Sequence, residues 1–273
     1  ELRHEARDAL VQRAAPVDER CLRRDFADRF VTEDTVRWDA SRRALSAQRE
    51  SRFDQIVFDA RPAGRVEPAL AAAALTDAVR DLGLDALPWP ESLQQWRERV
   101  RCLRDWMPDL GLPDLSDDAL MATLDDWLQP AFAGKTRLDA LGEDDLANAL
   151  KSGLDWSLRQ RIDALAPTRI TVPSGMERRI EYAHGQPPVL AVKLQELFGL
   201  ADTPRVADGR VPVLLHLLSP GGKPLQVTSD LRNFWNSTYA EVKKEMKGRY
   251  PKHPWPDDPW SAQATHRAKP RGT

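Results

Sequence analysis

Hydrophobic spacing divides the chain into a strand-rich start, a helical middle and a strand-rich end. Between Pro68 and Ile162, apolar residues recur every three or four positions, which is the spacing of an amphipathic helix. Before and after this stretch, short runs of β-branched and aromatic residues are separated by Gly and Pro turns, which is typical of strands. The pattern predicts an α+β fold: a small β-meander or barrel remnant, a central helical domain, and a C-terminal mixed α/β domain with a Pro-rich tail.

The first predicted domain, residues 1–66, combines a short helix with a β-meander. A helix is expected over 18–30, where one side carries only apolar residues. Polar turns separate the strands that follow, and Pro62 and Gly64 end the last of them. The meander is interpreted as the end of a barrel that begins upstream. The expected strands are 35–38, 44–47 and 53–58.

The second predicted domain, residues 67–166, is helical. Pro68 suits the first turn of its first helix, and Gly83 suits the C-terminal cap. Ser92 is expected to cap the second helix. Apolar residues from Leu146 onward step strictly by four, which predicts one long final helix. The four expected helices cover 68–82, 92–107, 116–128 and 146–162.

The third predicted domain, residues 167–273, returns to strands and ends in a tail from residue 251. Thr238 and Glu241 have the spacing of a capping box at the start of its main helix, and Gly248 suits the end of that helix. Prolines exclude regular structure in the tail, and whether its tryptophans dock it on the same domain is left open. The expected strands are 168–172, 179–182, 188–192 and 211–218, and the expected helices are 194–198 and 238–246.

Composition excludes several classes of protein. The 273 residues include 40 Lys and Arg against 42 Asp and Glu, a formal net charge of −2, so bulk charge does not predict binding to a polyanion. No stretch approaches the ~18 apolar residues of a membrane span, and no membrane insertion is expected. Cys21 and Cys102 fit no disulfide or zinc pattern, which favours a cytoplasmic protein. Because the first residue is Glu1 and not Met, the sequence is expected to be part of a longer chain.

Charge is distributed unevenly along the chain. Residues 105–146 hold eleven acidic and two basic residues, whereas residues 223–273 hold ten basic and five acidic ones. Either run could be a solvated face. Basic groups interleaved with aromatic rings also suit RNA, because cations neutralise phosphates and rings stack on bases. The basic run supplies the RNA-binding candidates Lys243, Lys244, Lys247, Arg249, Tyr250, Lys252, His253 and Trp255.

Catalytic motifs are incomplete in this sequence. The run from Gly134 to Thr136 resembles the end of a phosphate-binding loop, but Gln129 stands where the motif requires its first glycine. The segment from Ser219 to Lys223 lacks Ser or Thr after its lysine and is predicted to be a hairpin turn. The five histidines have no ligand spacing. The sequence therefore predicts no catalytic residue and no metal site.

Several runs of residues carry a family resemblance. They are TVPSG at 171–175, LQELFG at 194–199, GRVPV at 209–213 and, above all, PLQVTSDLRNFWNSTYAEVKKEMKGRYPKHPWPDDP at 224–259. These runs resemble the C-terminal region of the HrpB family of bacterial DEAH-type ATP-dependent RNA helicases. GLDALPW at 83–89 and LDW at 154–156 extend the resemblance over nearly the whole chain.

This resemblance implies two RecA-like motor domains upstream in the full-length protein, with ATP and Mg²⁺ bound between them. The parent protein would then be an ATP hydrolase, whereas this chain would be a non-catalytic accessory region without its own cofactor. It would contribute to binding single-stranded RNA or to docking a partner, and residues 1–66 would end an oligonucleotide-binding-like barrel. The alternative is a protein-protein interaction module without RNA contact, in which the acidic helical domain or the Pro-rich tail engages another protein.

Overall fold

The computed structural model of the chain describes residues 15–64 and 66–267. Contacts between Cα atoms group the chain into two compact units. The first comprises Glu1–Ala78 with Phe132–Ala140, and the second comprises Val79–Ala131 with Leu141–Thr273. The three-domain boundaries drawn from the sequence stay predictions, and their first fourteen and last six residues lie outside the described residues.

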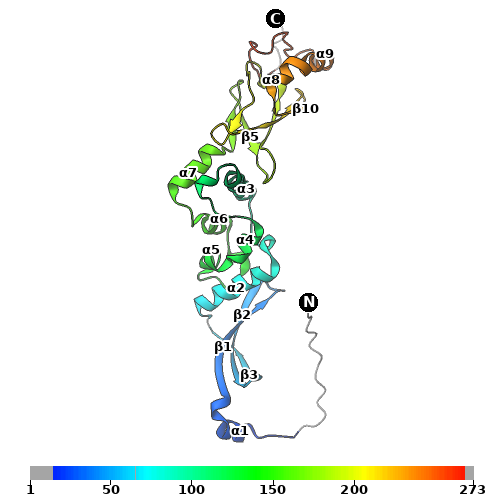
Figure 1. The fold of residues 1–273 in the computed structure, drawn as a ribbon. Helices are drawn as coiled ribbons and strands as arrows, with labels where there is room; N and C mark the ends of the chain where they lie inside the picture. Colours follow the sequence, from blue (N-terminus) through cyan, green and yellow to red (C-terminus); the bar gives the residue numbers. More distant parts are fainter. Residues whose placement is uncertain (1–14, 65, 268–273) are drawn as a thin grey trace. The chain divides into compact units, whose positions relative to one another are not determined.

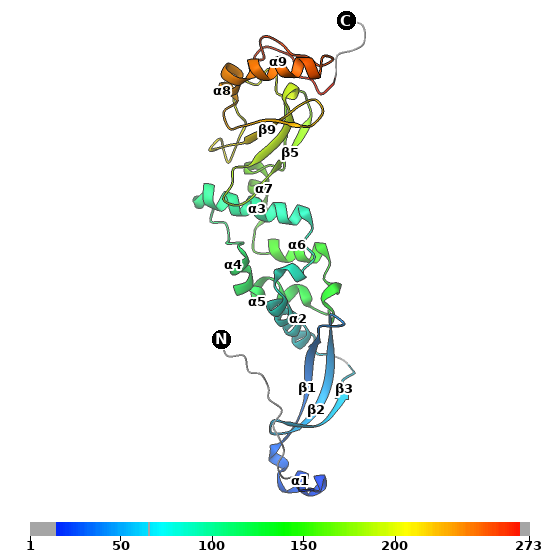
Figure 2. The same ribbon diagram turned by 90° about the vertical axis from the view of Figure 1, so that its right-hand side faces the viewer.

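A three-stranded antiparallel sheet dominates the first unit, in the order β1, β2, β3 (Figure 2). All ten residues of β1 (Phe30–Asp39) pair with β2 (Ala44–Phe53), and β3 (Ile56–Pro62) pairs with the other edge of β2. The predicted meander is confirmed, and β1 and β2 extend beyond the runs that predicted them. The single strand predicted over 53–58 is wrong, because residues 54 and 55 form the turn that joins β2 to β3.

The helix predicted over 18–30 is too long. Helix α1 (Glu19–Asp25) ends early, a 3₁₀ turn follows it, and Phe30 already belongs to β1. The ring of Phe30 lies 5.1 Å from that of Phe53 and 5.5 Å from that of Phe58. Aromatic packing in the sheet therefore takes Phe30 out of the helical pattern.

Helix α2 (Pro68–Leu82) begins and ends as predicted, and Gly83 follows it with φ of 85°. Helix α3 (Glu91–Trp106) begins before Ser92, which was wrongly predicted to be its N-cap. The amides of Leu93 and Gln94 both donate to the Pro90 carbonyl at 3.0 Å, so Pro90 occupies the cap position.

The region predicted as one helix over 116–128 holds two, α4 (Asp117–Ala122) and α5 (Leu124–Trp127). Between them, the Thr123 hydroxyl donates to the Ala119 carbonyl at 2.8 Å, a local side-chain bond that competes with regular helix. The leucines at 120, 124 and 128 are nevertheless buried, so the apolar spacing correctly predicted the core.

The long final helix predicted over 146–162 is also two helices, α6 (Glu143–Lys151) and α7 (Trp156–Leu165). The Asp155 carboxylate accepts a hydrogen bond from the Leu158 amide at 2.7 Å and thereby starts a new helix. Gly153, just before it, is a poor helix former. Leucines on both sides of the break remain buried, which is why the spacing by four hid it.

A five-stranded sheet in the order β10, β9, β6, β5, β4 forms the C-terminal part of the second unit (Figure 1). Neighbouring strands are antiparallel except β6 and β9, which are parallel. A separate two-stranded ribbon pairs β7 with β8. The strands are β4 (Arg169–Thr171), β5 (Glu177–Glu181), β6 (Val189–Lys193), β7 (Arg205–Val206), β8 (Val211–Pro212), β9 (Leu214–Leu218) and β10 (Pro224–Thr228).

The predicted strands agree with the observed ones in position, with these exceptions. The stretch 211–218 is split into β8 and β9, and neither β7 nor β10 was predicted. The predicted hairpin turn between β9 and β10 is confirmed, because the Ser219 amide donates to the Lys223 carbonyl at 2.8 Å. The helix predicted over 194–198 is a single 3₁₀ turn, Leu194–Glu196.

The last helix is longer than its prediction of 238–246. It runs through α8 (Leu231–Asn233), a π-helical turn (Phe234–Thr238) and α9 (Tyr239–Arg249), beside the strands of the sheet in both views (Figures 1 and 2). Thr238 lies inside this helix and caps nothing, so the predicted capping box is wrong, as is the predicted stop at Gly248.

The buried aromatic residues explain this longer helix. Asp230 is the actual N-cap, and its carboxylate accepts from the Asn233 amide at 2.9 Å. Within the π-helical turn, Trp235 packs on Phe198 and Tyr239, with ring centroids 6.0 and 5.3 Å apart. Burial of these rings against the sheet favours helix upstream of Thr238 despite the local capping signal.

The tail from residue 251 forms no helix or strand up to residue 267, yet it is packed on its own unit. Trp255 is 9% exposed, and its Nε1 donates to the Tyr250 carbonyl at 2.9 Å. The Gly199 amide donates to the Pro259 carbonyl at 2.9 Å, and the Thr265 amide donates to the Gln195 carbonyl at 3.0 Å. The described tail thus packs on the segment that follows β6 and on the end of α9.

Candidate nucleic-acid interface

The RNA-binding candidates all lie on α9 and the segment that follows it. Lys244, Lys247, Arg249 and Lys252 are exposed. Arg249 pairs with Glu245, with 3.3 Å between Nη1 and Oε1. Within the described chain, the other three cations have no carboxylate oxygen within 4 Å. These three lysines are therefore free to neutralise phosphates.

Lys243 differs from its neighbours because it is bound to the tail. Its side chain is only 18% exposed, and its ammonium forms an ion pair with Asp257. The hydrogen bond and the charge of Lys243 lower the pKa of the Asp257 carboxyl, and the charge of Lys247 adds to this effect. Lys243 therefore fastens the tail to α9 and is not a free cation.

The aromatic candidates are less accessible than the cations. Trp255 is buried, with its N–H already bonded to the main chain. Tyr250 is half-buried and its hydroxyl lies 3.5 Å from the Ser219 hydroxyl. His253 is also half-buried, and burial, together with the charge of Lys193, lowers its pKa. The structure therefore brings cations to the surface of this segment and uses most of its rings for packing.

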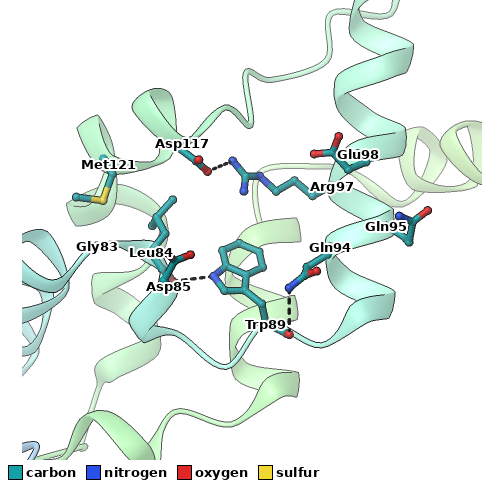
Figure 3. A pocket seen from close by; sticks show the side chains of 10 residues that line it. All are labelled: Gly83, Leu84, Asp85, Trp89, Gln94, Gln95, Arg97, Glu98, Asp117 and Met121. Atoms are coloured by element: carbon teal, nitrogen blue, oxygen red, sulfur yellow. Dashed lines mark hydrogen bonds and ion pairs between the residues drawn. The ribbon is translucent and has the colours of Figure 1, made fainter. Parts of the chain in front are cut away.

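A cleft of about 570 Å³ lies in the helical part, between α3 and α4 (Figure 3). Arg97 Nη2 donates to Asp117 Oδ1 at 2.6 Å, and the guanidinium carbon lies 5.5 Å from the centroid of the Trp89 ring. Trp89 Nε1 donates to the Leu84 carbonyl at 2.8 Å. The polar groups at the centre of this cleft are thus bonded to one another, and they tie α3 to α4.

A second cleft, of about 690 Å³, is lined by residues of α3, α6 and α7. The indole of Trp156 is 71% exposed there. The ammonium of Lys151 lies 5.0 Å from the centroid of the Trp96 ring. Arg159 lines the same cleft, and its Nη2 donates to the Lys151 carbonyl at 2.6 Å. None of these residues was predicted to be functional from the sequence.

The prediction of one long helix over 146–162 gave no indication of this cleft. On one continuous helix, Lys151 and Trp156 would be separated by five steps of about 100°, which places them on nearly opposite sides. The break between α6 and α7 instead lets both residues line one cleft. The run LDW at 154–156 was recognised in the sequence, but only the tertiary structure shows that Trp156 lines a cleft.

The glycine-lysine-threonine run at 134–136 does not fit a nucleotide. The Thr136 carbonyl accepts from the Leu45 amide at 2.9 Å, and Ala44 and Arg137 form an isolated antiparallel bridge. The run thus pairs with β2, whereas a phosphate-binding loop leads from a strand into a helix. In residues 15–64 and 66–267, no group of three or more His, Cys, Asp or Glu is arranged to hold a metal ion.

No helix in the described part of the chain combines the length and apolar character needed to cross a membrane.

Known proteins resemble the chain over most of its length. A family model, "ATP-dependent helicase C-terminal" of HrpB, matches residues 127–259. The ATP-dependent RNA helicase HrpB of Escherichia coli (strain K12) is 42% identical over 236 residues, which are 86% of this chain and 29% of that protein.

Two crystal structures of E. coli HrpB resemble the fold. One is described as a DExH-box NTPase, with a TM-score of 0.74 and 40% identity over 93% of this chain and 31% of that one. The other is described as a DEAH/RHA helicase, with a TM-score of 0.64 and 39% identity over 91% of this chain and 30% of that one. The chain thus spans less than a third of the length of these relatives.

Proposed function

Because the chain belongs to the HrpB helicase family and corresponds to its C-terminal region, we propose that it is a non-catalytic accessory region that helps to hold single-stranded RNA. In the full-length protein, two RecA-like motor domains would precede it, bind ATP and Mg²⁺ and hydrolyse ATP in the cytoplasm. The present chain would supply part of the RNA-binding surface.

The three unpaired lysines on and after α9 carry this proposal. Lys244 and Lys247 are three residues apart on α9, so they share a side of the helix. Lys252 follows on the packed tail, and the Lys243 to Asp257 pair holds that tail against α9. A group of unpaired cations on one segment suits the phosphates of an RNA strand, because each phosphate contact releases counterions.

Binding of a fluorescently labelled single-stranded RNA of roughly 12 nucleotides tests the proposal. Three phosphate contacts predict a salt slope of about −2 for a single strand, so affinity should fall roughly 20-fold between about 50 and 200 mM salt. The variant Lys244→Gln/Lys247→Gln/Lys252→Gln should lose this dependence. Lys223→Gln, which removes an exposed lysine of the β9 to β10 turn, is the control and should change little.

An unchanged affinity and slope in the triple variant would remove these lysines from the interface. If the chain binds no RNA at both salt concentrations, its RNA-binding function is refuted and partner docking is favoured.

One observation favours a protein partner as the second candidate. A cleft of about 400 Å³ near α5 is lined by Leu120, Trp127 and Leu154, with Asp114 and Asp126 also among its residues. It lies in the strongly acidic stretch of the sequence, where phosphate would be repelled. The partner would have to present apolar side chains flanked by basic groups.

A further inference from the structure

We propose that the cleft lined by α3, α6 and α7 binds one unpaired base of single-stranded RNA, with Trp156 as the stacking surface and Lys151 as the cation for an adjoining phosphate. The inference rests on the proposed RNA-binding function and adds to it a contact in the helical part of the chain, remote in sequence from α9.

The exposure of Trp156 is the first reason. All nine tryptophans lie within the described residues, and Trp156 is the one in the exposed class, with 71% of its surface accessible. It is the first residue of α7, and the Asp155 cap stabilises the backbone of this first turn. An exposed indole offers a flat apolar surface to a base, and stacking of this kind tolerates any base.

Polar groups in the same cleft suit the edges of a base. Asn148 and Gln160 are both exposed, and their amides line the cleft with Trp156. A side-chain amide offers two donors and a carbonyl acceptor, which is the combination that the edge of an unpaired base requires.

Lys151 lacks a direct counter-charge. Its ammonium lies over the Trp96 ring and has no carboxylate oxygen within 4 Å in the described chain. Burial lowers the pKa of Lys151, while the charge of Asp163 opposes this change. Asp163 is itself engaged with Arg99, with 2.5 Å between Oδ1 and Nη2. A phosphate would give the partly desolvated ammonium a direct partner.

The charges of the cleft are also ordered along α6. Glu143 and Asp144 line it at the start of the helix, where acidic residues favour the helix dipole. Lys151 ends the helix, about 12 Å away at 1.5 Å per residue. Phosphate is therefore repelled from one end of α6 and attracted to the other, where the break brings Trp156 into the cleft.

Binding of a roughly 12-nucleotide oligoadenylate to the whole chain, compared with an abasic oligomer of equal length, tests the inference. Trp156→Ala should weaken oligoadenylate binding about 5- to 100-fold, the range of one lost base stack. It should leave abasic binding unchanged, because stacking needs a base. Trp156→Phe should recover most of the affinity, and Lys151→Gln should reduce the salt slope by about 0.7.

Leu82→Ala is the control, since Leu82 is an apolar side chain exposed at the end of α2. If Trp156→Ala binds both oligomers as the wild type does, while the triple lysine variant loses affinity, the inference fails and the proposed function stands. If Trp156→Ala weakens only the base-containing oligomer while the triple lysine variant binds normally, the cleft is supported and α9 is not. Absence of any oligomer binding refutes both.

Discussion

Removal of the ion pair between Arg178 and Glu196 is expected to destabilise the C-terminal part of the chain. Glu196 is completely buried, and its two carboxylate oxygens accept from Nε and Nη2 of Arg178, both at 2.7 Å. The adjoining Gln195 carbonyl accepts from the Thr265 amide of the tail. Arg178→Ala would leave a buried carboxylate without its charged partner, one residue along the chain from the tail contact.

The expected loss of stability follows from burial. Removal of one partner from a fully buried pair costs about 3–5 kcal/mol. Because the Arg178 side chain is 31% exposed, water can partly replace it, and we expect about 2–4 kcal/mol. For a unit of this size that corresponds to a decrease in melting temperature of roughly 4–16 °C.

Urea unfolding followed by tryptophan fluorescence measures this loss, because several tryptophans are buried in the same unit. Arg232→Ala is the matched control: its bidentate pair with Asp202 is exposed, at 60% and 71%, and should be worth about 1 kcal/mol or less. The double variant Arg178→Met/Glu196→Leu should recover most of the loss, since it leaves no buried charge. Equal losses for Arg178→Ala and Arg232→Ala would refute the reasoning.

Two further predictions concern the tail and the helix break. Gly199→Ala should lower the free energy of unfolding by about 1–2 kcal/mol and make the tail more sensitive to limited proteolysis. Gly199 has φ of 80°, and a Cβ there would lie 3.2 Å from the Ala262 carbonyl oxygen. Gly153→Ala, in open space, should change little, and an equal effect of both would contradict this account. Hydrogen bonds from the α7 backbone and from a serine lower the pKa of Asp155 below its usual 3.8. The ionised Asp155 carboxylate therefore stabilises the folded state at neutral pH, and this stabilisation is lost as the pH falls through the folded-state pKa. Asp155→Ala should therefore be less stable than the wild type at pH 7 and approach it below about pH 4 in urea titrations, whereas a gap that persists at low pH would exclude this role.

Local pattern was sufficient for much of the fold. The spacing of leucines correctly identified the buried side of the helical part, and the Gly and Pro turns placed most of the strands. Pro68 and Gly83 marked both ends of α2, because the backbone preferences of these residues act within one turn of helix. The run at 224–259 was specific enough to identify the family.

The candidate site was only partly accessible from sequence. A basic run was visible, but its members do not have equal roles: Lys243 is fixed to Asp257 and Trp255 is buried, whereas Lys244, Lys247 and Lys252 are exposed and unpaired within the described chain. Pairing between a helix and a tail depends on where distant segments meet, which composition does not record.

The sequence by itself determined the division into strand-rich and helical parts, the buried side of the helical part and the family, because each depends on short-range spacing or on long runs of identity. Tertiary structure alone decided where the helices break, which rings are buried and which cations remain free. The break between α6 and α7 leaves the leucine spacing intact and yet brings Lys151 and Trp156 into one cleft. Such a site forms from the packing of three helices, and no local propensity specifies it.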